Sequence, residues 1–329
     1  MLKKTGTRTG IVLLAIMMSF IWASPSLAAE DYPKSPVQIV IPFAPGGLTD
    51  IFWRSTSDFL ANNMKGTIVL VNKAGGGGVV GTSFGANAKP DGYTLFSANS
   101  DPLTISPVFT PNVPYDPDKD FTYIAKMAAF AFTIAVQGES PFKTIEDVVA
   151  YAKTNPKKLK AAVMGVGTTP HTILEVFNRD AKIEITAVPF DSGGESVTNL
   201  LGGHTELTVV SLPSIKSHVL SGKARILAFC SPKRLPEFPE VPTISEKGYK
   251  RSSIATGVGL AGPKSLPPAM VSKWQEAIDK TFKDQKVIDV MQKLGGVVID
   301  YKTGEAYKNE LMADLAVFKE LLPTLPGKK

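Results

Sequence analysis

Short apolar runs alternate with amphipathic segments of helical length in the part of the chain that follows the N-terminal region. Each run has about five residues and is rich in β-branched side chains, which favours a strand. Between the runs, apolar residues recur at helical spacing. A strand that is repeatedly followed by a loop and a helix is typical of a parallel α/β sheet. The expected strands are 37–41, 67–71 and 93–97, and the expected helices between them are 48–64 and 79–88.

The same rhythm returns in the second half of the chain. Residues 121–137 are apolar and are expected to be extended, and Thr144 with Asp147 resembles a capping box that opens a helix ended by Asn155-Pro156. Further strands are expected at 159–164, 183–189, 207–210 and 225–230, and further helices at 171–177, 196–201 and 215–220.

The pattern divides the chain into two α/β units and a tail. Two aperiodic stretches, 101–120 and 231–253, are the places where we expect the chain to leave one unit and to return. Residues 254–261 form an apolar, glycine-rich run, and apolar residues at helical spacing predict a helical tail after it. The length of 329 residues also suggests two domains.

The N-terminal region has the pattern of a secretory signal peptide. Lys3, Lys4 and Arg8 precede an uncharged apolar run at 11–22, and the small residues of Ser26-Leu27-Ala28 predict cleavage after Ala28. The run is shorter than the roughly 20 residues that a membrane span needs. We therefore expect an exported protein, either secreted or periplasmic.

Composition and charge exclude several classes of protein. The chain is 43% hydrophobic, which excludes a disordered protein. It has 36 Lys and Arg against 30 Asp and Glu, and three of the basic residues belong to the expected signal peptide, so nucleic-acid binding is not indicated. The single Cys230 excludes a disulfide framework, and three scattered His residues form no zinc motif. We expect neither a cofactor nor a metal site.

Three glycine-containing turns lie between an expected strand and an expected helix, at 42–47, 165–171 and 190–194. The first backbone N–H groups of a helix have no partner within the helix, and the helix dipole adds positive potential there. Such a turn can bind an anion without a basic side chain. Because ligands of α/β proteins bind beyond the carboxyl ends of the strands, the three turns predict an anion-binding cleft between the two units.

Two other motifs could indicate different chemistry. Residues 76–81 fit G-x-G-x-x-G, but four residues separate them from the preceding strand and no acidic residue follows where a ribose would need one. Residues 81–85 fit G-x-S-x-G, but Ser83 follows glycines and a helix start, whereas a nucleophile elbow needs a strand. An exported serine hydrolase that uses Ser83 stays an alternative, as does a periplasmic ligand sensor of a signalling system.

A series of motifs runs in order along nearly the whole exported chain. They are Tyr-Pro-Lys-Ser-Pro-Val at 32–37, Ile-Pro-Phe-Ala-Pro-Gly-Gly-Leu-Thr-Asp at 41–50, Val-Asn-Lys-Ala-Gly-Gly-Gly-Gly at 71–78, Lys-Pro-Asp-Gly-Tyr-Thr-Leu at 89–95, Pro-Tyr-Asp-Pro at 114–117, Asp-Phe at 120–121, Gly-Val-Gly-Thr at 165–168 with His171, Val-Pro-Phe at 188–190, Leu-Leu-Gly-Gly at 200–203 and Pro-Glu-Val-Pro-Thr at 239–243. This series resembles the substrate-binding proteins of tripartite tricarboxylate transporters, the Bug receptor family.

The resemblance implies a bilobal α/β protein of the type II periplasmic-binding-protein class, with a ligand cleft between two domains of parallel or mixed sheet. Lobe 1 would combine 29–125 with 254–329, and lobe 2 would hold 126–253. The family implies a monomeric receptor, not an enzyme. It would capture a small carboxylate, either a di- or tricarboxylic acid or an aromatic acid, and deliver it to the membrane components of the transporter. The expected ligand-binding residues are Phe43, Ala44, Pro45, Gly46, Gly47, Asp50, Asn99, Gly167, Thr168, Thr169, His171, Phe190, Asp191, Gly193 and Ser211.

Two departures from the family pattern concern the pocket. Where the family often has Tyr-Lys-Gly, this chain has Phe190-Asp191-Ser192-Gly193, so a hydroxyl is lost and an acid replaces a base. Gly257 stands where the family commonly has an aromatic residue. A particular ligand, citrate included, is therefore not carried over from a relative.

Overall fold

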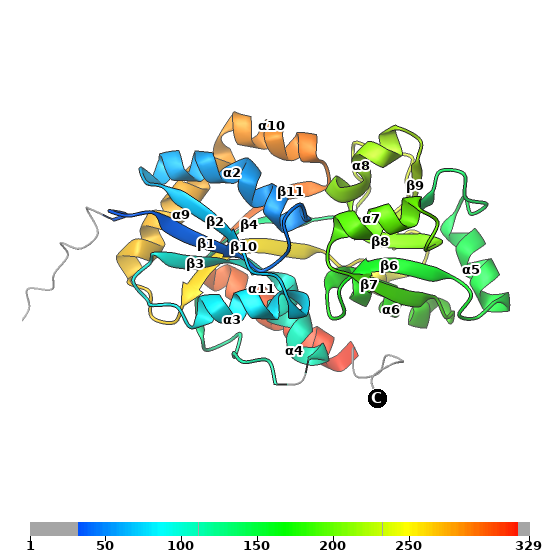
Figure 1. Cartoon of the computed structure of the whole chain (residues 1–329), viewed down its shortest axis with the longest axis horizontal. Helices are drawn as coiled ribbons and strands as arrows, with labels where there is room; N and C mark the ends of the chain where they lie inside the picture. The colour runs from blue at the N-terminus through cyan, green and yellow to red at the C-terminus, as the bar shows by residue number, and fades with distance from the viewer. Residues whose placement is uncertain (1–31, 111, 232, 322–329) are drawn as a thin grey trace, which may run out of the picture.

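The computed structural model describes residues 32–110, 112–231 and 233–321. The expected signal peptide and its cleavage after Ala28 lie outside the described residues. The described chain forms two α/β lobes side by side, each built on its own sheet (Figure 1).

The described strands of lobe 1 are β1 (Val37–Ile41), β2 (Ile68–Asn72), β3 (Thr94–Asn99), β4 (Phe121–Phe130), β10 (Thr256–Pro263) and β11 (Val297–Thr303). They form a six-stranded sheet in the order β11-β4-β10-β3-β1-β2. β1 lies parallel to β2 and β3, as two successive strand–helix–strand units require. β10 is antiparallel to β3 and β4, and β11 is antiparallel to β4. The sheet is therefore mixed.

The described strands of lobe 2 are β5 (Phe132–Gln137), β6 (Lys160–Met164), β7 (Thr186–Phe190), β8 (Leu207–Ser211) and β9 (Ala224–Cys230). Their order is β7-β6-β8-β5-β9. β6 is parallel to β7 and β8, while β5 is antiparallel to β8 and β9. This sheet is also mixed, and β5 is its link to lobe 1.

The chain passes from one sheet to the other at Ala131, between the last residue of β4 and the first of β5. The expected exit within 101–120 is therefore wrong, because β4 still pairs with β10 as far as Phe130. The chain returns to the first sheet between Cys230 and Thr256. The lobe limits at 125/126 and 253/254 stay a prediction.

Helices cover both faces of each sheet. The described helices are α2 (Leu48–Met64), α3 (Val79–Ala86), α4 (Ser106–Phe109), α5 (Ile145–Thr154), α6 (Thr169–Ala181), α7 (Gly193–Leu201), α8 (Leu212–Leu220), α9 (Pro268–Lys283), α10 (Gln285–Leu294) and α11 (Gly304–Leu321), with short helical turns η2 (Gly76–Gly78), η3 (Asp101–Ile105) and η4 (Lys250–Ser252).

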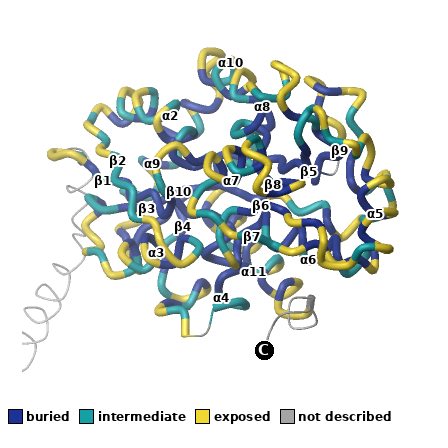
Figure 2. Tube along the Cα trace, turned by 45° about the vertical axis from the view of Figure 1, so that its right-hand side comes forward, coloured by how far each residue is buried: buried dark blue, intermediate teal, exposed yellow. Residues whose placement is uncertain are grey.

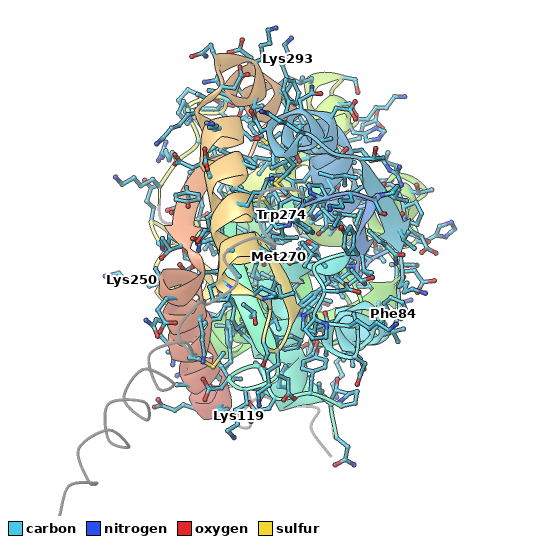
Figure 3. The ribbon with its side chains drawn as sticks, turned by 90° about the vertical axis from the view of Figure 1, so that its left-hand side faces the viewer. Phe84, Lys119, Lys250, Met270, Trp274 and Lys293 are labelled. Carbon is cyan, nitrogen blue, oxygen red and sulfur yellow. The ribbon has the colours of Figure 1, made fainter. Side chains whose placement is uncertain are left out.

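Alternating side chains of a central strand explain the layers of lobe 1. Ile39 and Ile41 of β1 belong to one apolar cluster with residues of α2 and α9, whereas Val40 belongs to another with residues of α3 and α11. Trp274 of α9, labelled in Figure 3, is 1% exposed, and its indole N–H donates to the hydroxyl of Tyr32 at 2.9 Å. Figure 2 shows the same layering, with buried strands inside and exposed turns on the outer sides of the helices. In lobe 2, α5 and α6 contribute to one apolar cluster, and α7 and α8 to another.

Two expectations about elements need correction. The tail is not entirely helical, because β11 interrupts it and pairs with β4, 167 to 178 residues earlier in the chain. Val298 of this edge strand is exposed, so apolar and polar residues alternate only weakly along β11. Pairing with the neighbouring strand stabilises it instead. The stretch 101–120 contains η3 and α4, whose starts carry Pro102 and Pro107. Proline is well tolerated in the first turn of a helix, so these two residues did not indicate a loop.

Candidate functional site

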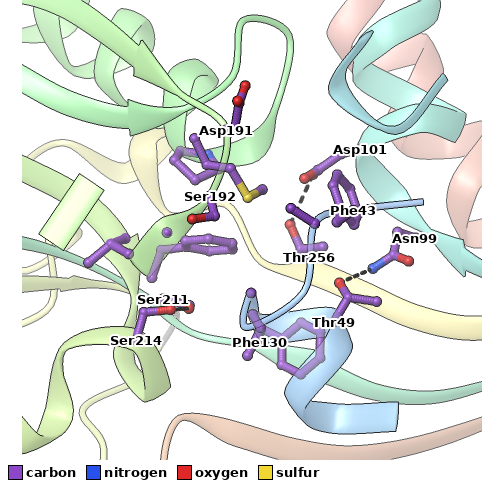
Figure 4. A pocket seen from close by; sticks show the side chains of 18 residues that line it. Phe43, Thr49, Asn99, Asp101, Phe130, Asp191, Ser192, Ser211, Ser214 and Thr256 are labelled. Atoms are coloured by element: carbon purple, nitrogen blue, oxygen red, sulfur yellow. Dashed lines mark hydrogen bonds between the residues drawn. The ribbon is translucent and has the colours of Figure 1, made fainter. Parts of the chain in front are cut away.

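A cavity lies between the two lobes (Figure 4). Its volume is about 30 Å³, which leaves room for a few water molecules. Both lobes supply walls. The lining residues are Phe43, Ala44, Gly47, Leu48, Thr49, Asn99, Asp101, Phe130, Phe132, Met164, Pro170, Asp191, Ser192, Gly193, Val210, Ser211, Ser214 and Thr256.

Several helices begin at this cavity. α2 follows Gly47 directly, α7 begins at Gly193, and α8 begins after Ser211, and all three of these residues line the cavity. The N–H groups in the first turn of each helix have no acceptor within that helix, and each dipole points its positive end at the cavity. Not all of these donors are free: the N–H of Leu212 in α8 donates to the carbonyl of Ala131 at 3.2 Å, Pro213 has no N–H, and the N–H of Glu195 in α7 donates to the hydroxyl of Ser192 at 3.1 Å. The starts of α2 in lobe 1 and of α7 in lobe 2 still present N–H groups to one small space.

The turn before α2 is held in place by Asp50. This carboxylate accepts hydrogen bonds from the backbone N–H of Gly46 at 2.9 Å, the guanidinium of Arg54 at 2.9 and 3.0 Å, and the amide of Asn72 at 2.9 Å. Asn72 also donates to the carbonyl of Phe43 at 3.0 Å. Burial raises the pKa of Asp50, but the donors outweigh it and leave that pKa below its usual value. Asp50 does not line the cavity, so its visible role is to fix the turn.

Asp101 is a buried acid in the cavity wall, at the start of η3. Its Oδ1 accepts hydrogen bonds from the backbone N–H of Thr169 at 3.2 Å, from the hydroxyl of Thr169, and from the hydroxyl of Thr256 at 3.3 Å. Burial raises its pKa to about 6, against the opposing effect of these donors. Thr169 begins α6 in lobe 2, so the hydrogen bonds of Asp101 link lobe 1 to lobe 2.

Uncharged polar groups complete the wall. The amide of Asn99 donates to the hydroxyl of Thr49 at 3.0 Å, and the hydroxyls of Ser211 and Ser214 lie 3.0 Å apart. None of the described residues that line the cavity is Lys, Arg or His. An anion held here would be bound by backbone amides and hydroxyls.

Residues 52–315 match the TctC family model, which describes the tripartite tricarboxylate transporter family receptor. This match covers well over half of the chain. The chain belongs to this receptor family.

Known relatives agree with this membership over most of their length. A Cupriavidus necator protein, called UPF0065 protein in gbd 5′ region, is 33% identical to this receptor and is matched over 84% of this chain and 83% of its own. The periplasmic binding protein BugD has a TM-score of 0.83 at 28% identity, with 89% and 98% of the two chains covered. The R. palustris protein Rpa4515, solved with adipate, has a TM-score of 0.85 at 26% identity, with 89% and 98% covered. The bilobal fold and the family resemblance are thus confirmed.

The family is one of solute receptors and not of enzymes, which does not favour a hydrolase built on Ser83. In this receptor Ser83 lies on α3 and lines a separate hollow with Lys73, Val80 and Phe84 among its other walls. No described residue around that hollow is a His or an acid, so the partners of a Ser-His-Asp triad are absent from its walls.

The predicted site residues of this receptor fall into three groups. Seven line the cavity, and Thr168 and Phe190 line an adjoining hollow that shares four lining residues with it. Pro45, Gly46, Asp50, Gly167, Thr169 and His171 line neither. The seven are Phe43, Ala44, Gly47, Asn99, Asp191, Gly193 and Ser211.

His171 illustrates why a predicted residue can be near the site without facing it. Its ring packs edge-on against Phe109, with ring centres 5.4 Å apart, and its Nδ1 accepts a hydrogen bond from the backbone of Gly167 at 3.4 Å. Burial lowers the pKa of His171 to about 4, so the ring is neutral at pH 7. It braces the turn before α6.

Other lining residues of this receptor were not expected from the sequence. Asp101 follows the end of β3 by two residues, which is the position where ligand-facing side chains of α/β sheets gather, and this signal could have found it. Phe130 and Phe132 flank the crossing at Ala131, and the hydrophobic pattern of the sequence did not locate that crossing. The remaining ones are Leu48, Thr49, Met164, Pro170, Ser192, Val210, Ser214 and Thr256.

No described helix of this receptor is both long and apolar enough to span a membrane. Among the described residues, no group of three or more His, Cys, Asp or Glu is arranged to hold a metal ion.

Proposed function

We propose that this protein is a periplasmic receptor that binds a small carboxylate between its lobes and delivers it to the membrane components of a tripartite tricarboxylate transporter. The observation that carries the proposal is the meeting of the α2 and α7 N-termini at one cavity without a basic side chain in its described wall. Charge-assisted hydrogen bonds from backbone N–H groups are strong, and they suit a carboxylate.

The family and its relatives support the same proposal. Rpa4515, which is named with adipate, and BugD, which is named as a periplasmic binding protein, share the bilobal fold with this chain. Export by the predicted signal peptide, with cleavage after Ala28, would place the receptor in the periplasm. We propose that it acts there as a monomer, with lobe 1 formed by the two terminal parts of the chain and lobe 2 by the part between them.

Binding would involve opening and closing of the lobes. A cavity of about 30 Å³ is too small for an organic acid, so the lobes must separate before a ligand enters. Closure around the ligand would then bring the amides of α2 together with those of α7.

The proposed ligand-binding residues can be tested at Gly47. A Cβ built on Gly47 would meet only the carbonyl oxygen of Ala44, at an ordinary 3.4 Å, so Gly47→Ala should fold. The added methyl group would occupy the space next to the N–H groups of α2. We expect a loss of affinity of at least tenfold, which corresponds to about 1.4 kcal/mol.

The experiment begins with a thermal-shift screen of mono-, di- and tricarboxylates against the mature protein. Compounds that raise the melting temperature are then titrated by calorimetry into the wild type, Gly47→Ala and Ser83→Ala. The serine variant should bind as the wild type does, because Ser83 lies outside the cavity. A screen in which no carboxylate stabilises the protein, or equal affinity for wild type and Gly47→Ala, would contradict the proposal.

A further inference from the structure

We infer that the ligand carries one carboxylate and, on its other end, a hydrogen-bond donor such as an amide or ammonium group, and that the site rejects dicarboxylates. This inference rests on the proposed carboxylate receptor and narrows its substrate class. The receptor supplies its own second carboxylate, at Asp101.

The start of α6 already binds a carboxylate of the protein itself. The backbone N–H of Thr169 is the kind of donor that the helices α2 and α7 offer to a ligand, but here it already donates to Oδ1 of Asp101 at 3.2 Å. The hydroxyls of Thr169 and Thr256 donate to the same oxygen. A carboxylate from lobe 1 therefore occupies the anion position at the first turn of a lobe 2 helix.

The charged side chains in the described wall of the cavity are acidic. Two acids, Asp101 of lobe 1 and Asp191 of lobe 2, line it, and none of the described lining residues is basic. Glu195 adds a third acid nearby, because its carboxylate accepts a hydrogen bond from the backbone N–H of Asp191 at 3.0 Å.

Two basic residues near the glycine-containing turn before α2 have side chains that are engaged elsewhere. Arg54 donates to Asp50 and, at 3.1 Å, to Asn72. Lys73 lies over the ring of Phe84, 4.2 Å from its centre, at the hollow that contains Ser83. Neither side chain lines the cavity, so neither neutralises its acids there.

One carboxylate can bind at the starts of α2 and α7, and the apolar middle of the cavity suits a hydrocarbon or aromatic body. A second ligand carboxylate would face Asp101 and Asp191. Two like charges about 6 Å apart at an effective dielectric constant near 20 disfavour each other by roughly a hundredfold in affinity. A donor group in that place would be attracted instead. The apolar side chains that line the cavity are Phe43, Leu48, Phe130, Phe132, Met164 and Val210.

The test compares each dicarboxylate with its own monoamide, which keeps the shape, removes one charge and adds two N–H donors. The pairs are succinate and succinamate, adipate and adipamate, and terephthalate and its monoamide. Each compound is titrated by calorimetry at pH 7.5 into the wild type, Asp101→Asn and Asp191→Asn. We expect the wild type to bind the monoamide at least tenfold more tightly than the dicarboxylate, in every pair of which a member binds.

The variants assign that preference to a residue. Asp101→Asn should reduce the preference at least fivefold, and Asp191→Asn should reduce it less, because Asp191 is exposed and water screens its charge. Should Asp101→Asn fail to fold, the wild-type ratios still decide. A dicarboxylate that binds the wild type as tightly as its monoamide, or an unchanged ratio in folded Asp101→Asn, would overturn the inference and leave the proposed function standing. Binding of no carboxylate of any pair would overturn both.

Discussion

Asp50 and Asp101 are both buried acids beside a helix start, yet their pKa values move in opposite directions. Asp50 receives a charged donor, Arg54, together with an amide and a backbone N–H, and its pKa falls. Asp101 receives only hydroxyls and one backbone N–H in a fully buried position, and burial raises its pKa to about 6. A neutral donor set therefore does not compensate for desolvation where a guanidinium does.

The role of Asp50 in fixing the turn predicts a loss of stability in Asp50→Asn. We expect about 1–3 kcal/mol at pH 7, because Gly46, Asn72 and Arg54 lose a charged acceptor. The folded pKa of Asp50 lies below the unfolded value, so its contribution is present above about pH 4 and is lost as the pH falls through the folded pKa. Urea denaturation at pH 7 and pH 3 should show a gap between the two proteins that shrinks at pH 3. Asp58→Asn, at an exposed position of the same helix, is the control, and a gap independent of pH would count against this role.

The raised pKa of Asp101 predicts the opposite dependence on pH. The folded protein holds this proton up to about pH 6, whereas the unfolded chain releases it near pH 4, so Asp101 lowers stability as the pH rises between these values. Asp101→Asn lacks this loss. We expect its stability relative to the wild type to improve by about 3 kcal/mol between pH 4 and pH 7.5, since one pKa unit corresponds to 1.36 kcal/mol. Parallel urea-unfolding curves for the two proteins across that range would show the prediction to be wrong.

Asp50 and Asp101 also differ in how far their contacts can be predicted from the sequence. Asp50 lies four positions before its partner Arg54 and in the first turn of a predicted helix, so local spacing was sufficient to mark it. The partners of Asp101 are 68 and 155 positions away, on α6 and β10. No local sequence pattern predicts these hydrogen bonds, because they form between segments that only the folded lobes bring together.

At the scale of elements, local signals were reliable where they were strong. The expected capping box of α5 is present: the hydroxyl of Thr144 accepts from the backbone of Asp147 at 3.1 Å, and the carboxylate of Asp147 accepts from the backbone of Thr144 at 2.9 Å. The starts of α6, α7 and α8 were placed two or three residues too late, because proline, glycine and serine at those starts look like turn residues. β11 was missed since its strand character depends on distant β4.

The capping box predicts a specific cost for its removal. Thr144→Ala should lower the free energy of unfolding by about 1 kcal/mol, because the N–H of Asp147 loses its acceptor. Thr154→Ala, at the other end of α5, is the control and should change it by less than half as much. Guanidinium denaturation followed by circular dichroism measures both. Equal losses of stability in the two variants would show that the capping box makes no specific contribution to the free energy of unfolding.

For the whole molecule, the sequence indicates that there are two lobes but not where the chain crosses between them. The two α/β units were visible as repeated strand–helix patterns, but the crossing at Ala131 was not, because residues 121–137 read as one extended run. The backbone at that point is held by both lobes: the N–H of Ala131 donates to the carbonyl of Gly296 at 2.8 Å, and its carbonyl accepts from Leu212 at 3.2 Å. We expect any relative motion of the two lobes to be a rotation about the backbone at Ala131.

This arrangement predicts that the ligand-free protein in solution is more open than the structure described here. Polar contacts between the lobes, among the described residues, include Asp101 with Thr169, the hydroxyl of Ser106 with the carbonyl of Gly167 at 3.3 Å, and the ammonium group of Lys216 with the carbonyl of Lys293 at 3.1 Å. Each is worth about 1 kcal/mol net, and water can replace it on opening. A bound carboxylate would add donors from both lobes to the closed form alone, and a ligand shifts an equilibrium by its difference in affinity for the two states.

Small-angle scattering of the mature protein, with and without a carboxylate found in the thermal-shift screen, measures this change. The radius of gyration should be larger without ligand and should fall to the value of the closed structure at saturation. Gly47→Ala, at the ligand concentration that saturates the wild type, should stay near the ligand-free value, since the methyl group at the start of α2 weakens binding without touching the crossing at Ala131. A ligand-free protein that already scatters as the closed structure does, and that ligand leaves unchanged, would show that entry occurs without separation of the lobes.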